Sequence, residues 1–131
     1  MSSVRPPAEG DRAATAATIF VSDPSAEAER VAQALRAEGF VVVDVPLSML
    51  VSRAAVQPPR VILGDADAEE ILTELAKLRE IPSCEGTQVL LLGTGDEERA
   101  DNAVKEGHAH AFFVRPVDVP DVARKAVVLA G

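Results

Sequence analysis

The chain has 131 residues, a formal net charge of −8 and an apolar content of 47%. A chain of this length is expected to form one domain around a single core, and so high an apolar content excludes an intrinsically disordered protein. The negative charge and the absence of Trp and Tyr argue against nucleic acid as a partner, because nucleic-acid-binding proteins usually present a basic face with aromatic stacking platforms.

Membrane and redox features favour a cytoplasmic protein. An acidic surface disfavours anionic membranes, and no apolar run approaches the roughly 18 residues that a membrane span needs. The N-terminal segment lacks the apolar core of an export signal. The single cysteine, Cys84, cannot form an internal disulfide and is typical of a reducing compartment. We therefore expect partners that are proteins, with no binding to nucleic acid or membranes.

Along the chain, short apolar runs alternate with segments of helical periodicity. Residues 1–16 are rich in Ala, Pro, Ser and charge without periodicity, which predicts a mobile tail before a domain that spans residues 17–131. The predicted strands cover residues 18–21, 40–45, a run that starts at 61, 89–92 and 111–114. The predicted helices cover residues 25–38, 47–56, a segment that begins near 69 and stops at 81, 96–107 and 119–129.

Several residues mark the ends of these elements. Because Pro disfavours helical geometry in the residue before it, Asp23 is expected on the turn between the first strand and the first helix. Gly39 follows the first helix as a C-cap residue, and Asp96 is expected to cap the start of the fourth helix.

The central stretch is the run Val-Ile-Leu-Gly at residues 61–64, which leads directly to Asp65 and Asp67. A continuous apolar run of this length, bounded by two prolines and an Asp, is typical of a strand buried on both faces. Its acidic end should lie at the carboxyl edge of a parallel sheet, where open α/β sheets bind ligands. Asp65 is therefore the first candidate for chemistry.

Five strands alternating with five helices predict a doubly wound, three-layer α/β domain with a parallel sheet. We expect the flavodoxin-like strand order 2-1-3-4-5, because the first turn, Val-Ser-Asp-Pro-Ser, contains no glycine and so cannot be a dinucleotide-binding phosphate turn. A small flavodoxin-like enzyme is disfavoured, since phosphate-binding loops are missing and no Trp or Tyr is available to stack on flavin. We do not expect an enzyme.

In this topology the ends of the first, third, fourth and fifth strands converge at one edge. The polar residues gathered there are Ser22, Asp23, Asp65, Asp67, Gly93, Thr94 and Arg115. Two or three carboxylates around a small pocket suit Mg²⁺, which takes a few carboxylate oxygens and keeps the rest of its shell as water. A cation opposite them could hold a transferred phosphoryl group.

These residues resemble the receiver domain of two-component response regulators over about residues 17–131. The matching pieces are Val-Ser-Asp after the first strand, Ala-Leu-Arg-Ala-Glu-Gly-Phe at the end of the first helix, Pro-Pro-Arg-Val-Ile-Leu-Gly-Asp around the third strand and Phe-Phe-Val-Arg-Pro-Val-Asp after the fifth. The gaps from Val21 to Gly39 and from Gly93 to Arg115 both fit the family without insertions.

The resemblance implies a role for each matching residue. Asp65 matches the phospho-accepting aspartate, and Asp23 matches one of the two Mg²⁺-binding acids. Asp67 matches the position whose backbone carbonyl completes the metal site. Arg115 matches the lysine that pairs with the phosphoryl group, before a proline that is often cis. Phe112 matches the aromatic residue whose rotamer reports activation.

The chain also departs from the family pattern at this edge. Ser22 occupies the position of the family's first acidic residue. Gly93 occupies the position of the Ser or Thr whose hydroxyl moves to the phosphoryl group, and Thr94 follows one residue later. Arg115 replaces a lysine, which is not conservative where a compact ammonium must reach one oxygen. The loop after Asp65 is shortened. We therefore expect Mg²⁺ binding to be weak or absent and the usual coupling of phosphorylation to shape change to be lost.

Simpler structural roles remain open for the same residues. Asp65 or Asp67 could cap the third helix, with acidic residues favourably placed near its positive end. Asp23 could serve simply to form the turn before Pro24, with no role in metal binding. Arg115 could be a permanent internal counter-ion to Asp65 or Asp23, which would hold the pocket in one state without phosphate.

The expected function is an atypical receiver, or pseudo-receiver, in a two-component-like pathway, acting by binding a histidine kinase or a downstream effector. The face that the family uses for homodimers and effectors corresponds to about residues 96–131, with Phe112 and Val117 as the candidate interaction residues. The alternative is a functional phosphoacceptor, in which Asp65 attacks an acyl phosphate or phosphohistidine with Mg²⁺ bound by Asp23.

Overall fold

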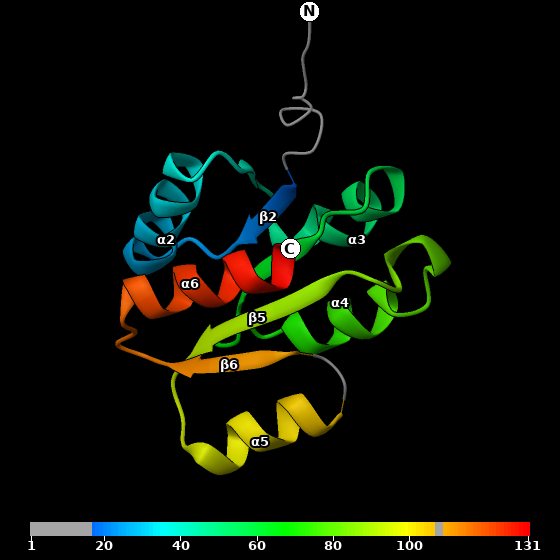
Figure 1. The fold of residues 1–131 in the computed structure, drawn as a ribbon. Helices are drawn as coiled ribbons and strands as arrows, with labels where there is room; N and C mark the ends of the chain where they lie inside the picture. The colour runs from blue at the N-terminus through cyan, green and yellow to red at the C-terminus, as the bar shows by residue number, and fades with distance from the viewer. Residues whose placement is uncertain (1–16, 107–108) are drawn as a thin grey trace, which may run out of the picture.

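The fold is described from a computed structural model of the chain (Figure 1). It describes residues 17–106 and 109–131. The predicted mobile tail, residues 1–16, and the predicted helix end at Gly107 lie outside the described residues.

The described residues form one sheet of five parallel strands. The strands are β2 (Thr18–Ser22), β3 (Val41–Asp44), β4 (Val61–Asp65), β5 (Gln88–Gly93) and β6 (Ala111–Val114). Their order across the sheet is β3-β2-β4-β5-β6, which puts β6 at one edge. This is the predicted flavodoxin-like order 2-1-3-4-5, and the prediction is confirmed.

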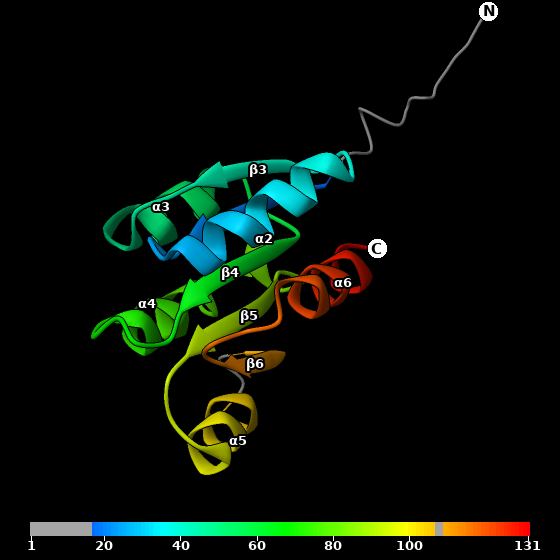
Figure 2. The ribbon, with the colours of Figure 1, turned by 90° about the vertical axis from the view of Figure 1, so that its left-hand side faces the viewer.

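Helices cover both faces of the sheet (Figures 1 and 2). The helical elements are α2 (Ala26–Ala37), α3 (Leu47–Val56), α4 (Ile71–Leu78), the short 3₁₀ helix η1 (Pro82–Cys84), α5 (Glu97–Lys105) and α6 (Val119–Ala130). Helices α2 and α6 pack side by side on one face, α3 and α4 pack together on the other, and α5 packs beside β6. No helix of the described part of the chain is long and apolar enough to cross a membrane.

The central strand β4 supplies side chains to the cores on both faces of the sheet. Val61 and Leu63 are buried in the cluster that includes α2 and α6, whereas Ile62 is buried in the cluster that includes α3 and α4. Successive residues of a strand point to opposite faces, so a strand covered on both sides needs an uninterrupted apolar run. The expected burial of this run is confirmed.

Three helix starts have side-chain caps: Ser25 caps α2, Asp118 caps α6, and Asp96 caps α5 as predicted. The Ser25 hydroxyl accepts a hydrogen bond from the amide of Ala28 at 3.1 Å, and the Asp96 carboxylate accepts one from the amide of Arg99 at 3.0 Å. After α2, Gly39 adopts a φ of 98°, a left-handed conformation that glycine tolerates best.

Helix α4 departs from the prediction at its start. It begins at Ile71, two residues later than expected, because residues 66–70 form turns in which the Ala68 amide donates to the Asp65 carbonyl at 3.1 Å. Glu70 occupies the N-cap position and makes no capping side-chain bond. The predictions that Asp65 or Asp67 caps this helix are therefore wrong, since both carboxylates are engaged elsewhere.

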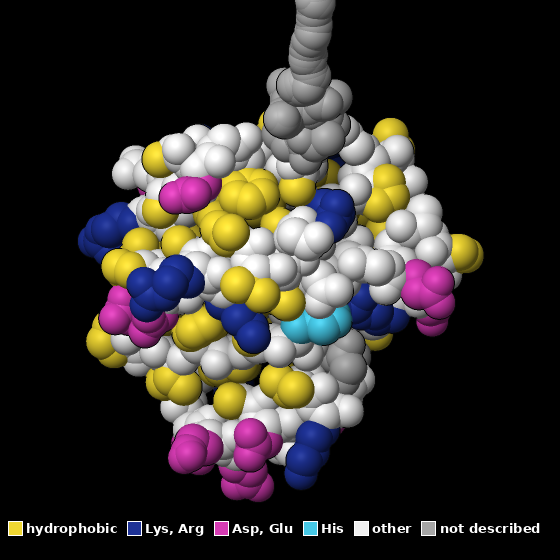
Figure 3. Space-filling view, in the orientation of Figure 1, with side chains coloured by type: hydrophobic (Ala, Val, Ile, Leu, Met, Phe, Trp, Pro, Cys, Tyr) yellow, Lys and Arg dark blue, Asp and Glu magenta, His cyan; other side chains and the backbone are white. Residues whose placement is uncertain are grey.

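In the face shown in Figure 3, hydrophobic and basic side chains lie across the middle, and acidic side chains lie nearer the margins, several of them over α5. The first turn of α5 contains Glu97 and Glu98.

Gly93, the last residue of β5, has no room for a side chain. A Cβ added there would lie 2.6 Å from Cβ of Ala66, 3.1 Å from Cζ of Phe112 and 3.3 Å from Oδ1 of Asp67. The backbone φ of Gly93 is not in the left-handed region, so space alone makes glycine necessary. A hydroxyl-bearing side chain at this position would displace its neighbours.

We predict that Gly93→Ala lowers the free energy of unfolding by about 1 to 3 kcal/mol, because overpacking forces the backbone or Phe112 to move. Urea unfolding followed by circular dichroism measures the change. Gly86→Ala is the matched control, since a Cβ at Gly86 meets nothing within 4 Å, and its effect should stay within about 0.5 kcal/mol. Equal effects of the two substitutions would contradict the packing argument.

Candidate functional site

The guanidinium of Arg115 lies at the centre of the carboxyl edge, in contact with four carboxylates. Its Nη2 atom is 2.8 Å from Asp23 Oδ2 and 3.1 Å from Asp65 Oδ1. Its Nη1 atom is 3.0 Å from Glu27 Oε1, and its Nε atom is 3.2 Å from Asp67 Oδ2. The predicted convergence of Asp23, Asp65 and Arg115 is confirmed.

The backbone around Arg115 fixes this side chain in place. Arg115 follows β6, its amide donates to the Gly93 carbonyl at 2.9 Å, and its peptide bond to Pro116 is cis. Nη2 also donates to the Leu92 carbonyl at 3.2 Å, and Nη1 donates to the Ser25 hydroxyl at 3.1 Å. Every nitrogen of the guanidinium therefore donates at least one hydrogen bond.

The charge of Arg115 is strongly stabilised by this environment. Partial burial acts to lower its pKa, but the hydrogen bonds to Asp23 and Glu27 and the charge of Asp23 outweigh that effect and raise the pKa above the ordinary arginine value. The side chain is only 14% exposed. It is a permanent cation at the centre of the acidic edge.

Asp23 forms the turn that was one of its predicted roles, and it also pairs with Arg115. Its side chain is fully buried. Oδ1 accepts a hydrogen bond from the amide of Ser25 at 2.9 Å, which forms the turn after β2, while Oδ2 binds Arg115.

Asp65 stands at the end of β4 with a side chain that is 19% exposed. Its Oδ1 atom accepts hydrogen bonds from the amide of Asp67 at 2.9 Å and from Arg115. Among the described residues, Oδ2 of Asp65 has no hydrogen-bond partner.

Asp67 joins three elements through its side chain. Oδ1 accepts from the amide of Thr94 at 2.9 Å, from the Thr94 hydroxyl at 2.8 Å and from Nη1 of Arg99 at 3.1 Å. Oδ2 accepts from Arg115. Desolvation opposes ionisation of this carboxyl, but the bonds from Thr94 and the two arginines outweigh it and lower its pKa to about 2.

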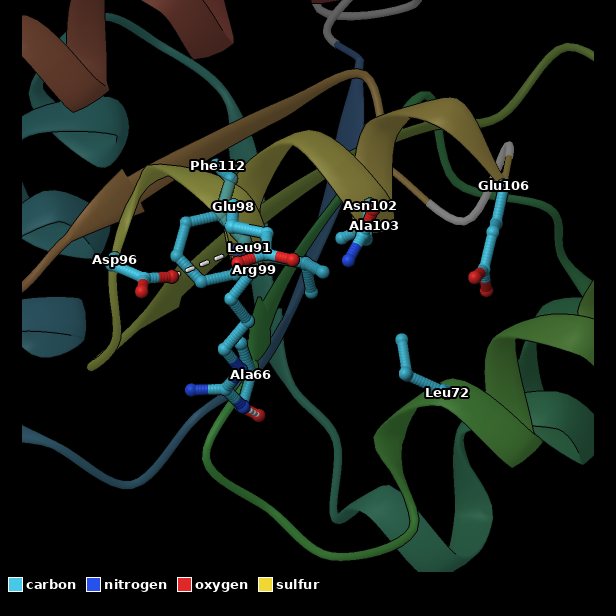
Figure 4. Close-up of a pocket in the computed structure, with 10 residues that line it drawn as sticks. All are labelled: Ala66, Leu72, Leu91, Asp96, Glu98, Arg99, Asn102, Ala103, Glu106 and Phe112. Carbon is cyan, nitrogen blue, oxygen red and sulfur yellow. Dashed lines mark hydrogen bonds between the residues drawn. The ribbon is translucent and has the colours of Figure 1, made fainter.

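Arg99, on α5, is a second cation at this edge that the sequence interpretation missed. Besides Asp67, its guanidinium donates to the backbone carbonyls of Ala66 and Thr94. Its Cζ atom lies 5.8 Å from the centre of the Phe112 ring, a cation–π distance. Figure 4 shows Arg99 reaching toward Ala66 beside Phe112, in a cavity of about 350 Å³ between α4 and α5.

Glu27, in the first turn of α2, is the other residue that the sequence interpretation missed. Its carboxylate accepts from the amide of Val117 at 2.7 Å and from Arg115. The bond from Val117 is the main cause that lowers its pKa, with Arg115 acting in the same direction against partial desolvation. An acidic residue in a first helical turn is common, so its position alone gave no signal of this long-range contact.

The predicted switch and interaction residues are spread over the site. The hydroxyl of Thr94 donates to Asp67, not to Asp65. Phe112 packs on the face of the sheet that carries α3 and α4, whereas Val117 packs against the cluster of α2 and α6. Phe112 and Val117 are therefore on opposite faces of the sheet.

The two carboxylates predicted to bind Mg²⁺, those of Asp23 and Asp65, both contact Arg115, as does the carboxylate of Asp67, whose predicted contribution was its backbone carbonyl. Ser22 stands in place of a further acid. Within residues 17–106 and 109–131, no group of three or more His, Cys, Asp or Glu side chains is placed to hold a metal ion. The acidic edge is arranged around a guanidinium.

Comparison with known proteins gives similarity in structure only. No protein-family model matches the chain, and no curated protein matches its sequence.

The solved structures that it resembles are response regulators and receiver domains. A response regulator from Desulfuromonas acetoxidans is 20% identical, with a TM-score of 0.72 over 86% of this chain and 94% of that one. A chemotaxis response regulator of Vibrio cholerae is 18% identical, with a TM-score of 0.75 over 87% and 98%. The receiver domain of a signal transduction histidine kinase from Syntrophus aciditrophicus is 21% identical, with a TM-score of 0.72 over 88% and 90%. The chain therefore has the fold of a response-regulator receiver domain.

Proposed function

We propose that this chain is an atypical receiver module of a two-component-like pathway, in which Arg115 permanently supplies the positive charge that acidic receiver sites otherwise take from Mg²⁺. The observation that supports the proposal is the contact of one guanidinium with Asp23, Glu27, Asp65 and Asp67. The module then acts by binding a partner protein, without depending on phosphorylation.

The charges at the edge support a stable internal ion cluster. Four carboxylates and the two guanidinium groups of Arg99 and Arg115 leave this edge with a net charge of −2. Arginine suits such a cluster, because its planar fork makes several charge-assisted hydrogen bonds at once and is more weakly hydrated than an ammonium. A metal ion would have to displace Arg115 from Asp23 and Asp65.

The surroundings of Gly93 and Thr94 also support loss of the phosphorylation switch. Gly93 has no room for a hydroxyl-bearing side chain, and the Thr94 hydroxyl is held by Asp67. No hydroxyl at this position is therefore free to turn toward a phosphoryl group on Asp65.

The proposed partner is a histidine kinase or a downstream effector in the cytoplasm. The proposed contact face comprises α5, β6 and α6 and contains Phe112 and Val117. Strand β6 is an edge strand, and Val114 on it is 44% exposed. Val104 on α5 is similarly exposed, and Val128 on α6 is more so. These apolar side chains offer contacts to an effector or to a second copy of the chain.

The second candidate function is phosphate acceptance by Asp65. The observation that favours it is the position of Asp65 at the end of β4, partly exposed, with Oδ2 unbonded among the described residues. In that reaction Oδ2 attacks the phosphorus of an acyl phosphate or phosphohistidine, the bond to the leaving group breaks, and an aspartyl phosphate forms.

We predict that Mg²⁺ with acetyl phosphate or beryllofluoride produces no saturable amide shifts around Asp65 in ¹H–¹⁵N NMR spectra, because Arg115 already occupies carboxylate oxygens that would take the metal. Asp65→Asn is the control variant. Saturable shifts in the wild-type chain that disappear in Asp65→Asn would contradict the proposal and establish phosphate acceptance.

We predict that Arg115→Gln lowers the free energy of unfolding by about 2 to 4 kcal/mol, because it leaves Asp23, Glu27 and Asp65 without their cation, while Asp67 keeps only Arg99. Arg115→Lys should lie between the wild type and Arg115→Gln, since an ammonium has three donors where a guanidinium has five. Denaturant titration at neutral pH gives these values.

The matched control for these variants is Arg124→Gln, which removes a guanidinium that is 70% exposed and paired with Asp121 on the surface of α6. Its effect should stay within about 0.5 kcal/mol. A loss in Arg115→Gln no larger than in Arg124→Gln would show that the ion cluster is dispensable.

The low pKa of Asp67 predicts a pH dependence of stability. The ionised carboxylate stabilises the fold fully above the ordinary Asp pKa of 3.8, and this contribution is lost as the pH falls toward the folded-state pKa of about 2. The urea midpoint of the wild type should therefore exceed that of Asp67→Asn at pH 6, and the difference should shrink between about pH 4 and 2. Asp101→Asn, at an exposed position on α5, is the control. A difference that is constant with pH would contradict this role.

A further inference from the structure

A separate cavity of about 570 Å³ opens at the same edge of the sheet, at the ends of β2, β3 and β4 and the start of α3. Asp23 and Asp65 border it, but Arg115 is not among its lining residues. Its volume falls within the range of small-molecule binding pockets, roughly 300 to 1,000 Å³. The ion cluster around Arg115 leaves this space unused.

One residue that lines the cavity, Ser22, has a polar atom without a hydrogen-bond partner among the described residues. Ser22 is 6% exposed, and within the described part of the chain its hydroxyl is buried with no hydrogen-bond partner. Ser22 projects from the same face of β2 as Phe20, which packs in the cluster with Val45. Val45 also lines the cavity, so the hydroxyl lies on the cavity side of the strand.

An unpaired buried hydroxyl costs a folded protein stability, because the group has lost its hydrogen bonds to water and gained none in return. A molecule that enters the cavity and hydrogen-bonds to Ser22 would remove that cost. The orphaned hydroxyl is therefore an independent indication that this cavity takes a ligand with a polar group.

The walls and rim define the chemistry of that ligand. Apolar surface comes from Pro24, Val45, Pro46, Leu47 and Ala68. Carboxylates also line the cavity, and the Oδ2 atom of Asp65 is not hydrogen-bonded within the described residues. The adjoining ion cluster around Arg115 has a net charge of −2. An apolar body with a positively charged donor group matches both features, whereas an anion would meet repulsion.

We propose that this cavity binds a small organic cation, a primary alkylammonium, whose apolar chain packs against Val45 and Leu47 and whose ammonium donates to Asp65 and Ser22. An ammonium has three donors and no acceptor, so it can satisfy a carboxylate and a hydroxyl together. The proposal concerns the unphosphorylated chain, because the ammonium and a phosphoryl group would use the same Oδ2 atom of Asp65.

The test is an NMR titration of the ¹⁵N-labelled chain with hexylammonium chloride. We expect saturable shifts of the amides of Ser22, Val45, Leu47 and Ala68. Hexan-1-ol should bind at least tenfold more weakly, and sodium hexanoate, which has the same chain but the opposite charge, should cause no saturable shift. Equal binding of the ammonium and the alcohol, binding of hexanoate, or the absence of saturation would overturn the proposal.

Two substitutions separate this site from general attraction to an acidic surface. Ser22→Ala should weaken hexylammonium binding at least fivefold, and Ala68→Leu, which narrows the cavity, should abolish it. Ser52→Ala, on the exposed side of α3, makes the same change outside the cavity and should have no effect. Unchanged affinity in both Ser22→Ala and Ala68→Leu would overturn the proposal.

Competition with inorganic cations completes the test. MgCl₂ should displace hexylammonium no better than NaCl at equal ionic strength, because a metal ion gains nothing from the apolar walls. Stronger competition by Mg²⁺ would show a metal site in place of an organic-cation site and would overturn the assignment.

Discussion

The contact of one guanidinium with four carboxylates is the interaction on which the site depends. Arg115 follows the edge strand β6, yet it reaches residues of β4, the turn after β2 and the first turn of α2. The Asp23 side chain is fully buried, and this cation and the Ser25 amide satisfy its carboxylate oxygens. Without Arg115, the acidic ends of these elements would repel one another.

The same interaction explains how the site differs from a metal-binding receiver. Arg115 already occupies the carboxylate oxygens that a metal would need, and a second guanidinium, Arg99, holds Asp67 and Thr94 together beside Phe112. The proposed signalling function follows from this permanent charge balance.

The sequence predicted the strand order and most element boundaries, because buried parallel strands and amphipathic helices leave strong periodic patterns. It also predicted that Asp23, Asp65 and Arg115 meet, since topology alone brings strand ends together. The sequence did not predict where α4 begins, nor the site contacts of Glu27 and Arg99. Each of these two residues looks like an ordinary charged residue in the first turn of its helix. Glu27 binds Arg115, 88 residues away, and Arg99 binds Asp67, 32 residues away. No local sequence pattern indicates contacts between residues so far apart.

The most direct test of the central claim is a crystal structure of the chain grown with Mg²⁺ and beryllofluoride. The proposed account predicts that the Arg115 guanidinium stays in contact with Asp23 and Asp65, with no metal between these carboxylates. A structure in which Arg115 has turned away and Mg²⁺ lies between Asp23 and Asp65, beside beryllofluoride on Asp65, would contradict it.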